Sequence, residues 1–296
     1  MLPLVYHPDY DLNLGAHVFP AQKYRLIREA LSDWPVHTPE PATDEDILRV
    51  HSPAWSFALR DGTLTPQQIR TLEIPWSPAM ARGFWLAAGG TILAAQLALK
   101  AGASYNIGGG FHHAFPNHGE GFCAIHDVAV AIRKLQADGL IRKALIVDTD
   151  VHHGNGTAAI FSSDPSVFTL SMHQLHNYPA EKPPSDLDIP LPDDVEDDEY
   201  LAALEPAVAK AIAEFGPDML FYVAGADPYF DDQLGGLALS IAGLAARDAV
   251  VLSAARSAGI PSVSTLAGGY ARRVEDTVAI HVNTAREAYK TLSSYA

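Results

Sequence analysis

The sequence contains a single cysteine and comparatively little positive charge. Cys123 is the only cysteine among 296 residues, which excludes an intrachain disulfide and a zinc site built from cysteines. This composition fits a reducing compartment, and we expect a cytoplasmic protein. Lys and Arg number 20 against 35 Asp and Glu, for a formal net charge of −15. Such a surface repels nucleic-acid phosphates and anionic lipids, so we expect neither nucleic acid nor membrane as a partner.

Long apolar segments typical of membrane or secreted proteins are also lacking. Residues Met1–Asp9 show no basic stretch followed by an apolar run, so we expect no signal peptide. The apolar segment Phe84–Leu99 is interrupted by glycines and polar residues, which favours a buried core helix over a membrane span. No internal repeat or low-complexity linker divides the chain. We therefore predict a single domain over residues 1–296.

Short apolar runs alternate with amphipathic segments. The runs predict strands at Leu2–Tyr6, Ser104–Ile107, Ala144–Asp148, Val167–Ser171, Met219–Ala224 and Pro261–Leu266. The segments predict helices at Ala21–Ser32, Ala81–Lys100, His126–Asp138, Asp197–Glu214, Ile241–Ala258 and Arg272–Tyr289. Strands that are apolar on both faces predict an α/β fold, with an open, mostly parallel sheet and helices on both faces. The proline-containing stretches Glu73–Pro78 and Pro179–Asp198 are expected to be irregular loops.

Histidines and acids follow two of these strands, where parallel sheets bind ligands. After the first comes Gly108–His113, which ends in two adjacent histidines. After the second comes Asp148–Gly156, in which Asp148, Asp150 and His152 fall on one side of an extended chain. Two buried carboxylates beside an imidazole need compensation, and a divalent zinc, iron or manganese ion is the simplest one. The alternative is a hydrogen-bonded Asp–His turn without metal.

Two further strands end in Gly225–Asp227 and Leu266–Tyr270. Taken alone, Asp227 could be a turn or helix-capping aspartate, and Tyr270 a tyrosine packed in a loop. Together with the first two clusters, they predict a site with three oxygen or nitrogen ligands and an open fourth position. That pattern is typical of catalytic rather than structural zinc.

These motifs, in this order, resemble the histone deacetylase superfamily. The similarity rests on Gly-Gly-Gly-Phe-His-His, Gly-Phe-Cys-Ala-Ile-His-Asp, Asp-Thr-Asp-Val-His-His-Gly-Asn-Gly, Ala-Gly-Ala-Asp and Ala-Gly-Gly-Tyr, and it runs from Val5 to about Ala285. Within the superfamily the chain is most similar to class IV deacetylases and their bacterial relatives. The resemblance implies an arginase/deacetylase-like sheet and hydrolysis of acyl groups from lysine-type amines.

The resemblance also implies roles for individual residues. Asp150, His152 and Asp227 would hold zinc, with Fe2+ as an alternative ion. His112 and His113 would flank the attacking water, with Tyr270 opposite them. Asp148 would lie behind His112 and near a structural potassium ion. The acyl-lysine channel would be lined by Gly121, Phe122, Tyr178 and Leu234, and Glu73 falls where many relatives grip the substrate backbone with an aspartate.

One position departs from the pattern of several deacetylase classes. Asn155 stands where those classes carry an aspartate behind the second histidine, and class IV members share this asparagine. Losing the carboxylate should make His113 less basic. Tyr270 is a true tyrosine, whereas weakly active relatives carry histidine there, and this favours an active enzyme.

Other functions compete with deacylation of lysine in peptides or proteins. A small acylated amine such as an acetylpolyamine could be the substrate, with an acidic rim from Asp193–Glu199 and Asp231–Asp232. An arginase-like dimanganese ureohydrolase would need more ligands than are evident. A catalytically idle acyl-lysine binding module would not need the complete set of zinc ligands, histidines and tyrosine. Acyl-chain length and oligomeric state are not specified by the sequence.

Overall fold

The computed structural model describes residues 1–12, 14–15 and 17–293, and its centre is an eight-stranded sheet. The strand order is β2-β1-β3-β8-β7-β4-β5-β6, and all seven neighbouring pairs are parallel. The strands are β1 (Leu4–Val5), β2 (Val36–His37), β3 (Ala103–Asn106), β4 (Ala144–Asp148), β5 (Val167–Gln174), β6 (Leu187–Leu191), β7 (Met219–Val223) and β8 (Ser262–Thr265). This confirms the predicted open, parallel α/β sheet.

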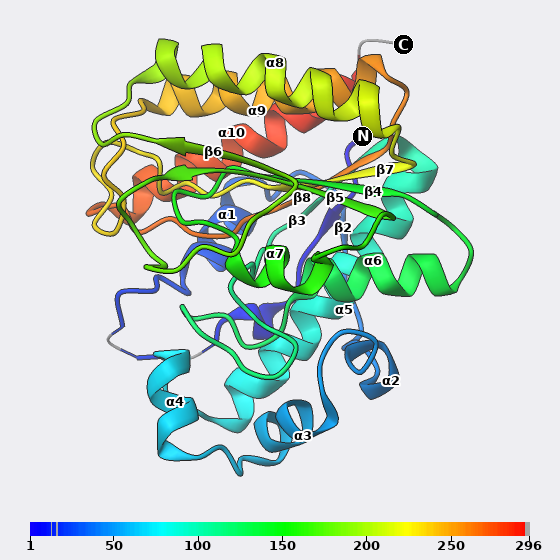
Figure 1. Ribbon diagram of the computed structural model, residues 1–296, viewed down its shortest axis with the longest axis vertical. Coiled ribbons are helices and arrows are strands. Elements are labelled where there is room, and N and C mark those ends of the chain that lie inside the picture. Colours follow the sequence, from blue (N-terminus) through cyan, green and yellow to red (C-terminus); the bar gives the residue numbers. More distant parts are fainter. Residues whose placement is uncertain (13, 16, 294–296) are drawn as a thin grey trace.

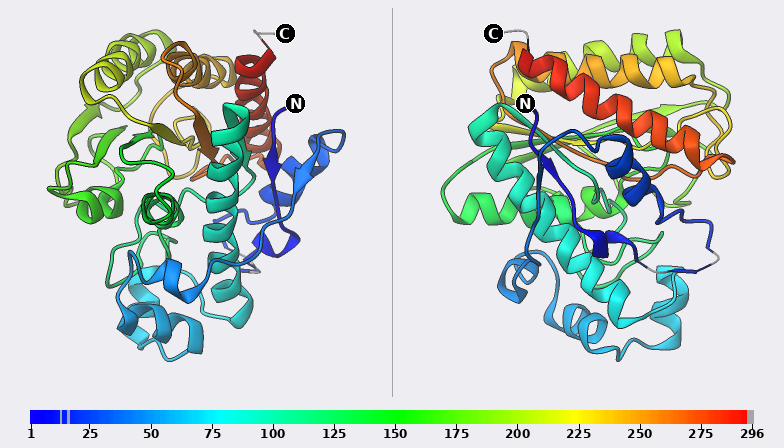
Figure 2. Two further views of the ribbon diagram at one scale, coloured as in Figure 1. Left: turned by 90° about the vertical axis from the view of Figure 1, so that its right-hand side faces the viewer. Right: turned by 180° about the vertical axis from the view of Figure 1, so that it is seen from behind.

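Helices cover both faces of this sheet (Figures 1 and 2). One layer holds α8 (Asp197–Phe215), α9 (Ile241–Ser257) and α10 (Val274–Ser293), with α1 (Lys23–Ala30) packed against α10. The opposite layer holds α5 (Pro78–Ala101), α6 (Asp127–Ala137) and α7 (Asn155–Phe161). The short elements η1 (Pro8–Tyr10), α2 (Asp44–Ile47), α3 (Pro53–Asp61) and α4 (Pro66–Leu72) lie around α5 and α6.

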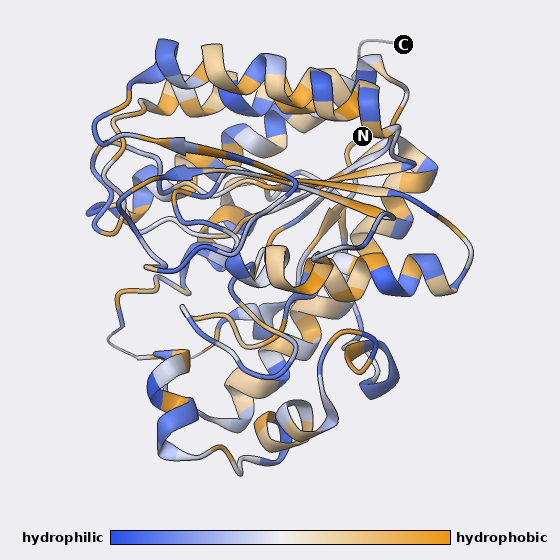
Figure 3. Cartoon of the chain, in the orientation of Figure 1, coloured by the Kyte–Doolittle hydropathy of each residue, from blue (hydrophilic) through white to orange (hydrophobic). Residues whose placement is uncertain are grey.

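The central strands form the apolar core. Every residue of β3, β4, β7 and β8 is buried, and β4 reads Ala-Leu-Ile-Val before its terminal Asp148. In Figure 3 the central strands are apolar while the outer helices carry polar residues on one side. Strands buried on both faces need apolar side chains in both directions. The same runs that predicted the strands therefore also build the core.

Helix α5 combines unusual length with apolar composition. Among the described residues it is the one helix long and apolar enough to cross a membrane, by length and composition only. Its most apolar window is 56% buried, and it packs against α6 and β3. Buried core helices pass the same test, so this is weak evidence for a span. The helix occupies the position of the buried core helix expected from the sequence.

All six predicted strands and all six predicted helices are present, with ends shifted by a few residues. The prediction of an irregular Pro179–Asp198 stretch was wrong in part, because β6 lies within it and pairs with β5. Strand β6 is half-exposed at the sheet edge and contains Pro190, which is tolerated at an edge where no second ladder is needed. The unpredicted β2, α2, α3, α4 and α7 span between two and nine residues, too few for a clear period.

Candidate active site and metal centre

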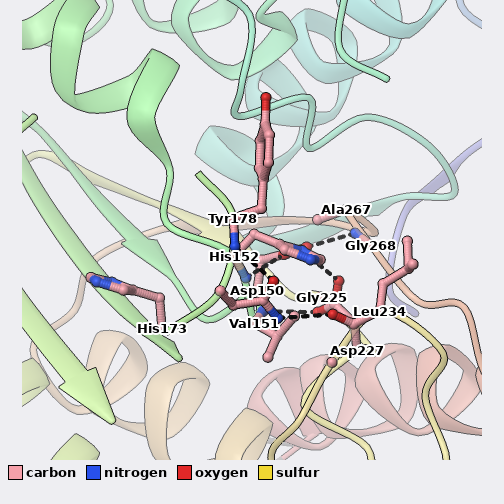
Figure 4. A network of polar contacts seen from close by, with 12 residues as sticks. Asp150, Val151, His152, His173, Tyr178, Gly225, Asp227, Leu234, Ala267 and Gly268 are labelled. Carbon is pink, nitrogen blue, oxygen red and sulfur yellow. Dashed lines mark hydrogen bonds and ion pairs between the residues drawn. The ribbon is translucent and has the colours of Figure 1, made fainter. Parts of the chain in front are cut away.

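Four loops converge at one edge of the sheet, and each follows a central strand. The strands are β3, β8, β7 and β4, which lie side by side in that order. Because their carboxyl ends face the same way, the segments Gly108–His113, Leu266–Tyr270, Gly225–Asp227 and Asp148–Gly156 meet there. Figure 4 shows Asp150, His152 and Asp227 turned toward one another. The structure thus brings together the residues that the sequence placed at separate strand ends.

Asp150, His152 and Asp227 form a buried group of potential metal ligands, which we call the metal group. One ligand atom from each lies within 4.8 Å of the others. His152 Nδ1 is 2.9 Å from Asp150 Oδ1 and 3.3 Å from Asp227 Oδ2. The other carboxylate oxygens accept backbone hydrogens, from Gly268 to Asp150 Oδ2 at 2.8 Å and from Val151 to Asp227 Oδ1 at 2.9 Å. These bonds fix both carboxylates in place.

The surroundings of this group fit a divalent cation. Asp227 Oδ2 is buried without a hydrogen-bond partner. A Cβ atom at Gly268 would lie 1.9 Å from that oxygen, and one at Gly225 would lie 2.6 Å from Asp150 Oδ2. The two glycines therefore leave room for both carboxylates and for a cation between them. Two carboxylates and one imidazole form a donor set that suits zinc, iron or manganese.

The electrostatics of the group point the same way. Burial and the nearby Asp150 carboxylate raise the pKa of Asp227 to about 7. Burial lowers the pKa of His152, but its hydrogen bond to Asp150 and the negative charges of Asp227 and Asp150 outweigh this and raise it to about 10. His152 therefore holds a proton beside the two carboxylates at neutral pH. A divalent cation would compensate both carboxylates and release that proton.

His112 lies against a second carboxylate. Its Nδ1 is 2.7 Å from Asp148 Oδ2, and its Nε2 is 3.7 Å from Asp150 Oδ1. Burial alone would lower the pKa of His112, but these two carboxylates raise it to about 9. His112 is therefore the histidine of the pair that carries a proton near neutral pH. Asp148 contacts His112 as the resemblance implied.

His113 has a neutral partner instead. Its Nδ1 lies 2.7 Å from Asn155 Oδ1. Burial, followed by the positive charge of His112 and His152, lowers the pKa of His113 well below its usual value. The ring is neutral near pH 7, and with the Asn155 oxygen facing it, Nδ1–H donates to Asn155 while Nε2 carries a lone pair. A neutral imidazole with a free nitrogen beside a metal group is chemically able to accept a proton.

Tyr270 stands across from the histidines and is held through its backbone. Its ring centroid lies 6.4 Å from that of His152 and 6.0 Å from that of Phe122. Its backbone N–H donates to Asp232 Oδ2 at 2.6 Å. Asp232 also accepts from the amides of Leu234 and Gly235, and only 8% of its surface is exposed. The expectation that Asp232 contributes to an acidic rim was therefore wrong, because its carboxylate is engaged in ordering this loop.

A cavity of about 270 Å³ opens onto His113, His152 and Tyr270. Its walls include all four residues expected to form the channel, and Tyr178 and Leu234 flank the metal group in Figure 4. The full lining is Glu73, His113, Gly121, Phe122, His152, Asn177, Tyr178, Leu234 and Tyr270. A cavity with aromatic and aliphatic walls accommodates an apolar stem whose polar end reaches the histidines.

Three residues at the site were missed from the sequence. Lys23 is fully buried, and its ammonium donates to the carbonyl of Ala267 at 2.7 Å beside the Tyr270 ring. Asn177 lies in the channel wall and donates to the Leu234 carbonyl. Glu120 accepts from Asn155 behind His113. Lys23 could have been suspected from the sequence, because it is a charged residue on the apolar face of α1. Asn177 and Glu120 lie in loops that have no periodic pattern.

A second group of potential ligands lies apart from this site and comprises His153, His173 and Asp188. Figure 4 shows His173 well away from His152. His153 Nε2 lies 3.2 Å from Asp188 Oδ1, Asp188 Oδ2 accepts from the Ser185 amide, and His173 Nδ1 lies 3.0 Å from the Ser171 hydroxyl. The His153–Asp188 contact links β6 to the loop after β4.

Comparison with known proteins agrees with this geometry. The profile of the histone deacetylase domain matches residues 17–285. The chain is 43% identical to an uncharacterized protein of Picosynechococcus sp., over 97% of this chain and 99% of that one. It is 31% identical to histone deacetylase 2 of Arabidopsis thaliana, over 93% of this chain and 77% of that one.

Two further comparisons extend the picture. The chain is 32% identical to the acetoin utilization protein AcuC of Bacillus subtilis, over 80% of this chain and 69% of that one. Its fold matches the crystal structure of the HDA15 HD domain with a TM-score of 0.80 at 24% identity, over 99% of this chain and 91% of that one. Because the domain profile matches residues 17–285 and these relatives align over most of both chains, the chain belongs to the histone deacetylase family.

Proposed function

We propose that the chain is a zinc-dependent hydrolase that removes acyl groups from lysine side chains of peptides or proteins. One observation carries the proposal. The cavity walled by Phe122, Tyr178 and Leu234 reaches His152 of the Asp150–His152–Asp227 group, beside His113 and Tyr270. The aliphatic stem of lysine suits such walls, and the amide at its end would meet all of the polar groups.

Asp150, His152 and Asp227 would hold the ion, which is zinc in this proposal and Fe2+ in the alternative. When bound, the ion would polarise the acyl carbonyl and lower the pKa of the attacking water. Asp148 and the carbonyls of Asp150 and His152, with the Ser171 region, would hold a structural potassium ion. We further propose a class IV-like enzyme that acts in the cytoplasm.

The chain's own side chains would divide the proton transfers. His113 is neutral and its Nε2 is free, so it takes a proton from water while the water oxygen attacks the carbonyl carbon. The Tyr270 hydroxyl donates to the oxyanion that develops. Burial raises the pKa of Tyr270 well above its usual value, and Asp150 and Asp227 add to this, so the hydroxyl stays a donor at neutral pH.

The C–N bond then breaks as the leaving amine receives a proton. His113 supplies it, while His112 remains positive through Asp148. The carboxylic acid that forms passes its own proton to the freed amine, so one water and one amide yield a carboxylate and a protonated lysine. Each histidine returns to its starting state, so the cycle needs no other reagent.

A turnover assay tests this proposal and ranks the substrates. The enzyme is loaded with zinc and given lysine peptides that carry acetyl, butyryl or myristoyl groups, together with acetylspermidine. We expect hydrolysis of at least one acyl-lysine peptide, at a kcat/KM above that of acetylspermidine. Preference for acetylspermidine would move the substrate to small cationic amines. No turnover of any of them, with the metal bound, would contradict the proposal and favour a binding module.

A further inference from the structure

Behind His113 a chain of hydrogen bonds leads to the half-buried carboxylate of Glu120. Asn155 Oδ1 contacts His113 Nδ1 at 2.7 Å, and Asn155 Nδ2 donates to Glu120 Oε1 at 2.5 Å. The Tyr178 hydroxyl donates to the same Glu120 oxygen at 2.9 Å, and His118 Nε2 lies 3.2 Å from the other one. Glu120 comes from the loop before α6 and Asn155 from the start of α7, so distant segments build this arrangement.

An asparagine beside a histidine can act in either of two ways. Its amide can present oxygen to the ring, which selects the Nδ1–H tautomer, or present NH2, which selects the Nε2–H tautomer. Only the first leaves Nε2 with a lone pair facing the channel. Asn155 alone therefore does not determine whether His113 is able to act as a base.

Glu120 removes this ambiguity, because an ionised carboxylate accepts hydrogen bonds and cannot donate them. Burial raises the pKa of Glu120, but the hydrogen bonds from His118, Asn155 and Tyr178 outweigh this and lower it below its usual value. A second cavity of about 600 Å³, lined by Glu120, Asn155 and Tyr178 among others, lies next to the carboxylate. The charge is therefore stable at neutral pH.

We propose that Glu120 is a positioning residue that locks the Asn155 amide and thereby holds His113 as the Nδ1–H tautomer. The negative charge that supports the base is thus one residue further out, at position 120. This inference rests on the proposed function in that His113 serves as the base. It adds the group that decides which nitrogen of His113 is free.

Three variants at Glu120 and Asn155 test the lock. E120M keeps the length of the side chain but replaces the carboxylate by a thioether, which is only a weak acceptor. We expect kcat to fall by about ten- to a thousand-fold, since a wrong tautomer alone can cost a serine protease about 10⁴-fold. N155D places a second carboxylate at hydrogen-bond distance from Glu120 and should also lower kcat. The double variant N155D/E120Q moves the charge next to His113, with the new amide at position 120 donating to the new carboxylate at position 155. It should recover most of the wild-type kcat.

The matched control is Glu181→Gln, which removes an exposed carboxylate from the wall of the same cavity, whereas the Asn155 amide donates to Glu120. It should retain the wild-type rate. Because Tyr178 also binds Glu120, a change in KM reports the channel wall, whereas kcat reports His113. A purely structural role for Glu120 predicts that N155D/E120Q is no faster than N155D or E120M. Failure of the double variant to exceed both single variants would therefore overturn the lock.

A second readout does not depend on turnover. In protein labelled with 15N-histidine, the ring nitrogens of His113, identified by their loss in His113→Gln, report the tautomer. We expect Nδ1–H in the wild type and in N155D/E120Q, and a mixture in E120M. If the wild type cleaves no acyl-lysine, the proposed function fails while this spectrum still decides the lock. If the wild type is active and E120M keeps both its rate and a pure Nδ1–H signal, the lock is wrong.

Discussion

Replacing Gly268 by alanine should weaken metal binding without unfolding the chain. The new Cβ would lie 1.9 Å from Asp227 Oδ2 and 2.6 Å from Asp150 Oδ2. Real Cβ contacts do not fall below 3.0 Å, so Asp227 Oδ2 must move by about 1.1 Å. Metal–ligand distances tolerate only about 0.2 Å, so this displacement removes a ligand, and we expect affinity to fall at least about 100-fold.

Thermal unfolding with and without zinc measures this loss. At a zinc concentration of about 1,000 times the wild-type Kd, binding stabilises the wild type by about 4 kcal/mol. A 100-fold weaker variant retains about 1.4 kcal/mol of this. The zinc-induced rise in Tm should therefore be smaller in Gly268→Ala by roughly 4 °C.

Gly216→Ala is the control for this experiment. Gly216 ends α8 at φ 64° with open space around its Cβ position, so alanine there strains the backbone far from the metal group. Its metal-free Tm should fall while the zinc-induced rise stays that of the wild type. An equal zinc-induced rise in Gly268→Ala and the wild type would refute the reasoning.

Three more substitutions probe other parts of the account. Tyr270→Phe should lower kcat by about 10² to 10³ with zinc content unchanged, and a near-normal kcat would exclude the oxyanion role. Lys23→Met removes a buried ammonium whose pKa is lowered, chiefly by burial, from 10.5 to about 8. Between pH 8 and 10.5 the folded chain therefore binds fewer protons than the unfolded chain. Chemical denaturation should show the free energy of unfolding of the wild type rising across this pH range, by up to about 3 kcal/mol relative to the variant. A flat difference would contradict that. Arg247→Leu removes the guanidinium that donates to the buried Asp248 carboxylate and to the Gly225 carbonyl. The free energy of unfolding should fall by about 3 to 5 kcal/mol. A loss below about 1 kcal/mol would show that Arg247 does not hold the loop that contains Gly225.

The residues of the metal group could be found from the sequence because each directly follows an apolar run. A parallel sheet aligns the ends of its strands, so local patterns at Asp150 and Asp227 already imply a shared location. The channel residues Phe122 and Tyr178 came from family resemblance alone, since neither lies in a periodic segment. The structure places both in the cavity wall.

Residues that act through long-range contacts could not be found in this way. Lys23 meets Ala267 across 244 positions, and Glu120 meets Asn155 across 35, with no local signal for either contact. Asp232 was expected to contribute to an acidic rim, but three backbone amides supply the compensation that buries it. Strand β6 escaped prediction because a half-exposed edge strand with a proline lacks the apolar run of its neighbours.

Metal stoichiometry measured together with turnover tests the central claim most directly. The wild type, dialysed and reloaded, should bind one divalent ion per chain by elemental analysis, and its rate should rise in proportion to occupancy. Asp150→Ala should lose both the ion and turnover while keeping the circular dichroism of the folded chain. A metal-free preparation that cleaves acyl-lysine at the full rate would contradict the account.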